Sequence, residues 1–303
     1  MSEIQPARER SILARIFFSP EEPRLRAGWR RLIHTILVFL FVVVAGIVVT
    51  LLKIPVETLN STLGNTILVF IAFTGSVYIA RRWLDKRSFA SLGVELGSHT
   101  LRDVLAGIGI TFVQMGFIFA VMLGLGWLTV EGFAWEVDPA SVIITNLVIF
   151  FVAYILVGWS EELLSRGYHL QTIASGTNLF WGVVISSAVF GLLHLGNPNV
   201  SWTNAVAIFA GIFFAGVYLA YAYLRTKQLW LAIGLHIGWN FFQGVVFGFP
   251  VSGTDAYPLT RVNVHGPDIW TGGAFGPESG LIVLPSLLLG GFLIYLYTRR
   301  RAK

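Results

Sequence analysis

Long apolar stretches recur along the whole chain and limit what it can fold into. Each is about 20 residues long, the length that an α-helix needs to cross the hydrocarbon core of a bilayer. They lie at roughly 31–52, 63–83, 104–130, 141–165, 178–196, 203–224, 229–249 and 280–298. Hydrophobic residues make up 55% of the 303 residues and charged residues only 12%, which is more apolar side chain than a soluble domain buries. The sequence therefore predicts an all-α, polytopic membrane helix bundle of about eight transmembrane helices.

Lys and Arg are unevenly distributed between the predicted loops. If the N-terminus is cytoplasmic, all of the 21 Lys and Arg residues except Lys53 and Arg261 fall on the cytoplasmic side. Cytoplasmic loops of membrane proteins carry an excess of these residues. We therefore expect both termini in the cytoplasm and, because the cytoplasmic loops are compact, a prokaryotic plasma membrane. The net charge of +5 has the same explanation, so we predict contact with membrane lipids and none with nucleic acid.

The chain divides into a basic N-terminal segment and one membrane domain. Residues 1–30 are predicted to be cytoplasmic, and the mixture of arginines and apolar residues in 6–26 fits an interfacial amphipathic helix as well as a disordered basic tail. Residues 31–303 form a single transmembrane domain, in which the Gly- and Pro-rich stretch 250–279 is expected to be an outer loop without regular structure. The chain has no cysteine, which excludes disulfides, thiolate metal sites and a cysteine nucleophile.

Two adjacent glutamates interrupt the apolar stretch FVAYILVGWSEELLSRGYHL. A carboxylate in hydrocarbon costs several kcal/mol and is rarely there without a function. On a helix, Glu162 lies four residues before Arg166, which is the favourable order for an ion pair, whereas Glu161 is rotated by about 100° from Glu162. We therefore predict a Glu162–Arg166 pair and expect Glu161 to find its partners on other helices.

Two further spans carry histidines at helical spacing. His194 follows Phe190 by four residues, and Asn240 follows His236 by four, so each pair shares a helix face. A single histidine in an apolar helix is more often a core residue bonded to a backbone carbonyl, and His169, near a predicted helix end, is expected to be solvated. A helix rise of about 1.5 Å per residue nevertheless places both pairs at the depth of the glutamates. We expect one buried site built from three helices.

These residue types leave two chemistries open. A carboxylate and an imidazole can take a proton from water while a second imidazole and a carboxamide donate hydrogen bonds to an oxyanion, which is the equipment for amide hydrolysis. Alternatively, Glu161, His194 and His236 form a ligand set for catalytic zinc, although the chain has no HExxH motif. The predicted cofactor is thus one divalent metal or none. The aspartates fall in loops or at span ends and Ser160 lies in GWSE, so aspartyl and serine protease chemistry are set aside.

Together the three segments resemble the motifs of the CAAX prenyl endopeptidase and bacteriocin-processing family, called CPBP or Abi. The family motifs EExxxR, FxxxH and HxxxN are matched by EELLSR at 161–166, FGLLH at 190–194 and HIGWN at 236–240. The resemblance covers about 141–249, which we take as the catalytic core. One departure is Ser165, where the family more often has a bulky residue; we expect it to reshape the pocket without removing a catalytic group.

The resemblance implies an intramembrane endopeptidase that cuts near the end of a lipidated or membrane-anchored peptide. It assigns a role to each motif residue: Glu161 activates water, His194 assists, Glu162 and Arg166 support Glu161, and His236 with Asn240 stabilises the oxyanion. In a metal-dependent version, Glu161, His194 and His236 hold the ion. The resemblance leaves the natural substrate open, since members act on prenylated CAAX tails or in bacteriocin processing and self-immunity.

Two other functions fit the same residues. A non-catalytic membrane scaffold or immunity protein would keep the motif for packing and bind a peptide without cutting it. A proton-coupled transporter would use Glu161 and His194 as a proton relay, but transporters commonly have repeated halves and the sequence has no such symmetry. Glu161→Gln separates the first alternative from a hydrolase, because only the hydrolase needs the carboxylate.

Overall fold

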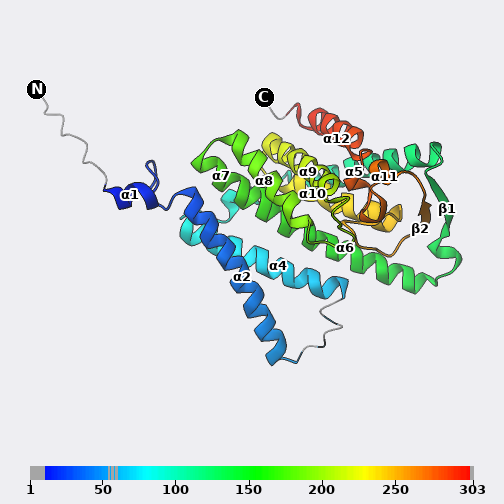
Figure 1. Ribbon diagram of the computed structural model, residues 1–303, viewed down its shortest axis with the longest axis horizontal. Helices are drawn as coiled ribbons and strands as arrows, with labels where there is room; N and C mark the ends of the chain where they lie inside the picture. The colour runs from blue at the N-terminus through cyan, green and yellow to red at the C-terminus, as the bar shows by residue number, and fades with distance from the viewer. Residues whose placement is uncertain (1–10, 54, 56–57, 59–60, 301–303) are drawn as a thin grey trace, which may run out of the picture.

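The computed structural model describes residues 11–53, 55, 58 and 61–300. Over these residues the chain is a bundle of helices with a two-stranded sheet at one end (Figure 1). The longer helices are α2 (Ala27–Leu51), α4 (Thr62–Ile79), α5 (Thr100–Gly124), α6 (Ala140–Glu162), α8 (Leu179–His194), α9 (Ala205–Thr226), α10 (Trp230–Asn240) and α12 (Val283–Thr298). This architecture confirms the predicted all-α, polytopic membrane bundle.

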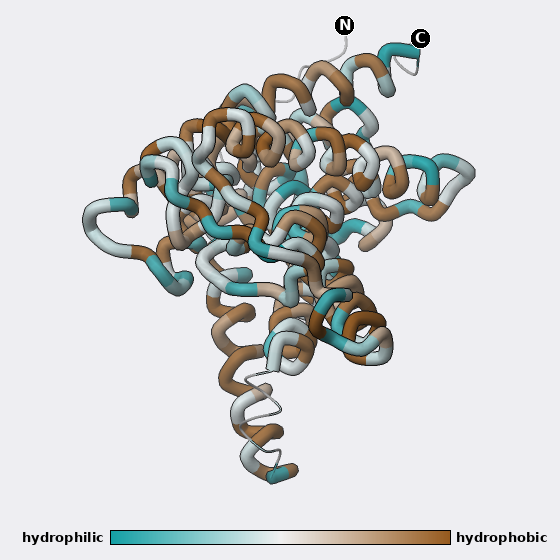
Figure 2. The backbone as a smooth tube through the Cα atoms, turned by 90° about the vertical axis from the view of Figure 1, so that its right-hand side faces the viewer, coloured by the Kyte–Doolittle hydropathy of each residue, from teal (hydrophilic) through white to brown (hydrophobic). Residues whose placement is uncertain are grey.

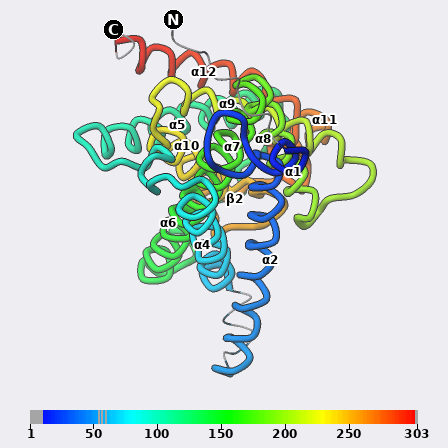
Figure 3. Tube along the Cα trace, turned by 90° about the vertical axis from the view of Figure 1, so that its left-hand side faces the viewer, coloured from blue at the N-terminus to red at the C-terminus, as the bar shows by residue number. Residues whose placement is uncertain are grey.

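Each of the eight apolar windows contains a helix. Five helical segments of the described chain are long and apolar enough to cross a membrane: Ala27–Leu51, Thr62–Leu84, Thr100–Gly124, Ala140–Gly176 and Ala205–Thr226. Two shorter apolar helices are α8 and α12, and the remaining window holds α10 and the π-helix η5 (Phe241–Val246). Figure 2 shows hydrophobic residues along these helices, and Figure 3 shows α2 protruding from the bundle.

Two window boundaries differ from the prediction. The window at 104–130 holds a shorter helix, because α5 ends at Gly124 and the chain turns through Gly126, whose φ of +69° favours glycine, into strand β1 (Leu128–Phe133). The window at 141–165 holds a longer one, because α6 continues through the π-helix η4 (Leu163–Leu170) and α7 (Gln171–Gly176). The glutamate segment therefore lies well inside a helical segment of 37 residues.

Glycines let α10 pack closely between α5 and α6. A Cβ on Gly234 would lie 2.2 Å from the carbonyl oxygen of Val104, and one on Gly238 would lie 2.1 Å from Oγ1 of Thr111. On the other side, a Cβ on Gly158 of α6 would lie 2.9 Å from Ile237. Small residues bring helix backbones together in this way in membrane bundles. The contacts fix α10 and hence the two polar side chains that it carries.

The segment before α2 is only partly helical. Of the predicted amphipathic stretch, residues 12–17 form the short helix α1 (Ile12–Phe17), whose Ile12 and Leu13 are 76% and 68% exposed. Exposed apolar residues beside arginines suit the membrane interface. Residues 1–10 of the predicted N-terminal segment lie outside the described chain.

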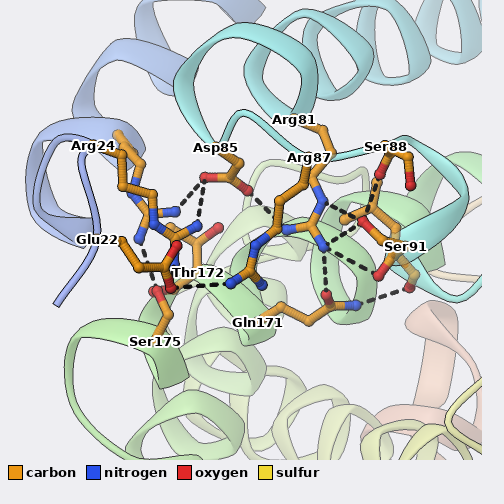
Figure 4. A network of polar contacts seen from close by, with 12 residues as sticks. Glu22, Arg24, Arg81, Asp85, Arg87, Ser88, Ser91, Gln171, Thr172 and Ser175 are labelled. Atoms are coloured by element: carbon orange, nitrogen blue, oxygen red, sulfur yellow. Dashed lines mark hydrogen bonds and ion pairs between the residues drawn. The ribbon is translucent and has the colours of Figure 1, made fainter.

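An ion-pair network joins this segment to the rest of the bundle (Figure 4). Asp85 accepts hydrogen bonds from Arg30 and, at 2.8 Å, from Arg81, and Arg24 lies 3.9 Å away. Glu22 in turn pairs with Arg24 at 2.8 Å. Asp85 directly follows the span Thr62–Leu84, in agreement with its predicted place in a loop or at a span end. It is buried there, because the surrounding arginines compensate the cost of burying its charge.

The stretch 250–279 is more regular than predicted. Strand β2 (Thr260–Val264) pairs antiparallel with β1, from Leu128 opposite Val264 to Phe133 opposite Thr260. A short helix, α11 (Asp268–Thr271), and two 3-10 turns follow. The prediction of an irregular loop was wrong because the strand partners lie more than 120 residues apart, and a short polar strand gives little signal by itself.

Candidate active site

Glu161 lies between the two predicted histidines. Its Oε2 is 3.6 Å from Nε2 of His236 and 4.0 Å from Nε2 of His194. The three side chains come from α6, α8 and α10, so the structure brings together the three segments that the sequence singled out. Separations above 3.5 Å between polar atoms suit an intervening water better than direct bonds. The Glu161 side chain is 24% exposed, whereas its Oε2, which faces the histidines, is buried and has no hydrogen-bond partner among the described residues.

Glu162 is held on two sides and is fully buried. Arg166 donates from Nη1 to its Oε1 at 2.8 Å, which confirms the predicted pair. Nδ1 of His236 contacts the same oxygen at 2.9 Å, a contact between helices that the sequence spacing could not reveal. An ionised carboxylate only accepts hydrogen bonds, so this Nδ1 carries the proton and donates it. The contact thereby directs Nε2 of His236 towards Glu161.

His194 is oriented by its own helix. Its Nδ1 lies 2.8 Å from the carbonyl oxygen of Phe190, one turn earlier. A carbonyl only accepts, so Nδ1 is the donor and Nε2 is left facing Glu161. The ring of Phe190 also lies 4.3 Å from the guanidinium carbon of Arg166, a cation–π contact. Phe190 therefore orients His194 through its backbone carbonyl and packs against Arg166 through its ring.

Asn240 and two cavities complete the site. Asn240 lies one turn after His236, and both line a cavity of about 50 Å³ together with His194. A second cavity is lined by Glu161, Ser165 and His194. Ser165 thus lines the same cavity as Glu161. His194 borders both cavities and Glu161 is reached from the second.

The predicted metal set does not fit the observed placement. Ligands of a tetrahedral zinc at about 2.0–2.1 Å lie about 3.3 Å from one another, whereas the Glu161 oxygen is 3.6 and 4.0 Å from the two imidazole nitrogens. Over the ranges that the structure describes, no group of three His, Asp or Glu side chains could hold a metal ion. The separations of Glu161 from His194 and His236 are thus longer than those of a preformed tetrahedral zinc site.

His169 is not solvated, contrary to the prediction. It is only 7% exposed, and its ring lies 5.4 Å from that of His34 on α2. The prediction failed because α2 packs against this end of the helix and covers the side chain. His169 lies on the side of η4 that faces α2.

One acidic residue of the cavity was missed by the sequence analysis. Glu278 lies in the 3-10 turn Pro277–Ser279 and is 3% exposed. It lines the same cavity as His194, His236 and Asn240. Burial raises the pKa of its carboxyl from the usual 4.5 to about 7. A single glutamate in a Gly- and Pro-rich stretch has no periodicity that would reveal its burial.

The fold and the site define an integral membrane protein with a buried Glu/His/Asn cluster where three helices meet. Residues 143–242 match a family described as Rce1-like, type II CAAX prenyl endopeptidase. This match supports membership of the CPBP family of CAAX-type proteases, as the three motifs predicted. The matched segment contains all of the motif residues and ends before the strand β2. No curated protein and no solved structure matches the chain.

Proposed function

We propose that the chain is an intramembrane endopeptidase that hydrolyses a peptide bond near the end of a lipidated or membrane-anchored peptide. One observation carries the proposal: the Glu161 carboxylate faces the Nε2 atoms of two oriented histidines, at 3.6 and 4.0 Å. These separations leave room for a water molecule that Glu161 and His194 both contact. The apolar walls of the neighbouring cavities suit a substrate that arrives from the lipid phase.

Glu161 acts as the general base. It takes a proton from the water as the water oxygen attacks the peptide carbonyl carbon, and His194 orients that water through its free Nε2. The resulting tetrahedral intermediate carries a negative charge on the former carbonyl oxygen. Glu161 then gives its proton to the leaving amine as the carbon–nitrogen bond breaks. Water is consumed, and the products are a carboxylic acid and an amine.

His236 and Asn240 stabilise the oxyanion. His236 lies between the carboxylates of Glu162 and Glu161, so its protonated ring is electrostatically stabilised and its Nε2–H can donate to the oxyanion. The amide of Asn240, one turn further on, supplies a second donor. Glu162 and Arg166 hold His236 in this orientation, which makes them positioning residues.

The proposal is tested by cleavage of a quenched, lipidated peptide library with the detergent-purified full chain. Glu161→Gln should lower the rate by a factor of about 100 or more, the usual effect of losing a general base. Glu131→Gln is the matched control, because Glu131 is exposed on β1 and should leave the rate unchanged. A strong chelator should also leave the rate unchanged, because the Glu161 oxygen lies farther from the two imidazole nitrogens than the ligands of a tetrahedral zinc lie from one another.

Two results would contradict this account. Unaffected cleavage by Glu161→Gln would remove the general base from the mechanism. Failure of the folded wild-type protein to cut any peptide of the library would instead favour a non-catalytic scaffold, with the motif residues forming a buried polar network.

A further inference from the structure

Glu278 is a buried acid that the mechanism does not use. It lies outside the segment that matches the family, yet its side chain reaches the cavity that His194, His236 and Asn240 line. The turn that carries it packs directly on α9, since a Cβ on Gly211 would lie 2.0 Å from the backbone oxygen of Glu278. The carboxyl is therefore held in the cavity wall by the fold.

Only neutral groups hold this carboxyl. Its Oε1 accepts from the backbone N–H of Ser252 at 2.5 Å and faces the Ser252 hydroxyl at 3.2 Å, and Oε2 accepts from the side-chain amide of Gln243. In the described part of the chain, no Lys, Arg or His lies within ion-pair distance of it. Glu162, by contrast, has an arginine partner. Buried charges are normally paired, because an unpaired one is costly.

A neighbouring acceptor lacks a hydrogen bond. Gln243, which donates to Glu278, is fully buried. Its Oε1 has no hydrogen-bond partner among the described residues, although a buried polar group normally requires one. The cation-free acid and this acceptor therefore make the surroundings of Glu278 electrically negative.

The remaining walls of the cavity are mainly apolar. They combine aliphatic side chains with aromatic rings: Ile212, Leu219, Leu235, Leu287, Phe190, Tyr218 and Trp239. A side chain with an aliphatic stem and a cationic tip matches such a site, because the stem packs against the apolar wall while the tip meets the Glu278 carboxyl. Lysine and arginine side chains have this chemistry. A purely apolar side chain would leave the Glu278 carboxyl without a cationic partner and lose the corresponding binding energy.

We propose that this cavity is a specificity pocket for a lysine or arginine side chain of the substrate peptide, with Glu278 pairing with its charged tip. The proposal rests on the proposed function, since the oxyanion-stabilising residues line the same cavity and place the bound side chain beside the bond to be cut. Glu278 is then a specificity-determining residue that the family motifs do not contain.

The test compares the binding of lipidated peptides that carry lysine or norleucine at each position in turn. Norleucine keeps the aliphatic stem and lacks the amine. Binding is measured by fluorescence anisotropy on full-length Glu161→Gln protein, which does not consume the peptide. At one position lysine should bind at least 10-fold more tightly than norleucine, and Glu278→Gln introduced into the same protein should remove this preference. Glu278→Asp should retain part of it, and Glu131→Gln all of it.

Equal binding of lysine and norleucine peptides at every position would overturn the proposal without requiring any change at Glu278. A lysine preference that survives in folded Glu278→Gln protein would also overturn it. The binding measurement separates this inference from the proposed function. Lysine preference without cleavage by the wild type would contradict only the protease, and cleavage without lysine preference would contradict only the pocket.

Discussion

At the scale of single residues, the adjacent glutamates have opposite surroundings. Glu162 is fully buried and bonded to Arg166 and His236, whereas Glu161 is partly exposed and faces the Nε2 atoms of His194 and His236. The two side chains point in different directions because successive residues of a helix are rotated by about 100°. The sequence alone could therefore distinguish them. The contact of Glu162 with His236 could not be predicted, because it depends on how two helices pack.

Removing Arg166 should destabilise the protein strongly. Arg166→Ala leaves the buried Glu162 without its cation, which typically costs about 3–5 kcal/mol. The matched control is Arg261→Ala, since Arg261 is 41% exposed in its pair with Asp138 and such pairs contribute about 0–1 kcal/mol. Thermal unfolding in detergent measures both changes, and equal melting temperatures for the two variants would contradict the assigned role of the pair.

Glu278 should make stability depend on pH. Its pKa is about 7 in the folded protein against 4.5 normally, so the folded state binds more protons between these values. The contribution to stability is complete below about pH 4.5 and is lost as the pH rises to 7. Between pH 5 and 8 the melting temperature of the wild type should fall more steeply than that of Glu278→Gln. Parallel pH profiles would show that the carboxyl is not protonated in the fold.

At the scale of secondary-structure elements, a π-helix follows each of two site helices. One is α6, which carries the glutamates, and the other is α10, which carries the HxxxN motif. The junctions lie at Glu162–Leu163 and at Asn240–Phe241. π-helical turns occur often at functional sites. The i, i+4 spacing predicted which side chains share a face, but periodicity cannot reveal a π-helix, because the extra residue in the turn is imposed by packing.

Close packing of α10 against α5 should be essential for the site. A Cβ on Gly234 would meet the backbone of Val104 at 2.2 Å, and backbone cannot move aside cheaply. Gly234→Ala should therefore shift α10 with His236 and Asn240, destabilise the protein by about 1–3 kcal/mol and lower the cleavage rate. In Gly109→Ala the new methyl group meets nothing within 4 Å, so neither property should fall. Equal stability and equal cleavage rates of the two variants would argue against the close approach of α10 to α5.

At the scale of the whole molecule, the sequence predicted the helices of the bundle better than the contacts between segments that are distant in the chain. Apolar length is a local property, so each of the eight windows contains a helix. The pairing of β1 with β2 and the burial of Glu278 and Asp85 depend on contacts between distant segments. The prediction that His169 is solvated was wrong for the same reason, because α2 buries this side chain. The motif spacings nevertheless located the site, since each motif is local to one helix.

The proposed topology can be tested with the cysteine-free chain. Lys53 and Lys227 are both exposed residues with positive φ, and they are predicted on opposite sides of the membrane. In intact bacterial cells that express the protein, a membrane-impermeant maleimide should label Lys53→Cys and leave Lys227→Cys unlabelled until the cells are opened. The reverse pattern would place both termini outside the cytoplasm.

The most direct test of the central claim is a single-turnover cleavage in water enriched in ¹⁸O, comparing the wild type with Glu161→Gln. The new carboxyl group should carry one oxygen from water, and the Gln variant should react at least about 100-fold more slowly. Cleavage at an undiminished rate by the folded Gln variant would contradict the assignment of Glu161 as the residue that activates water.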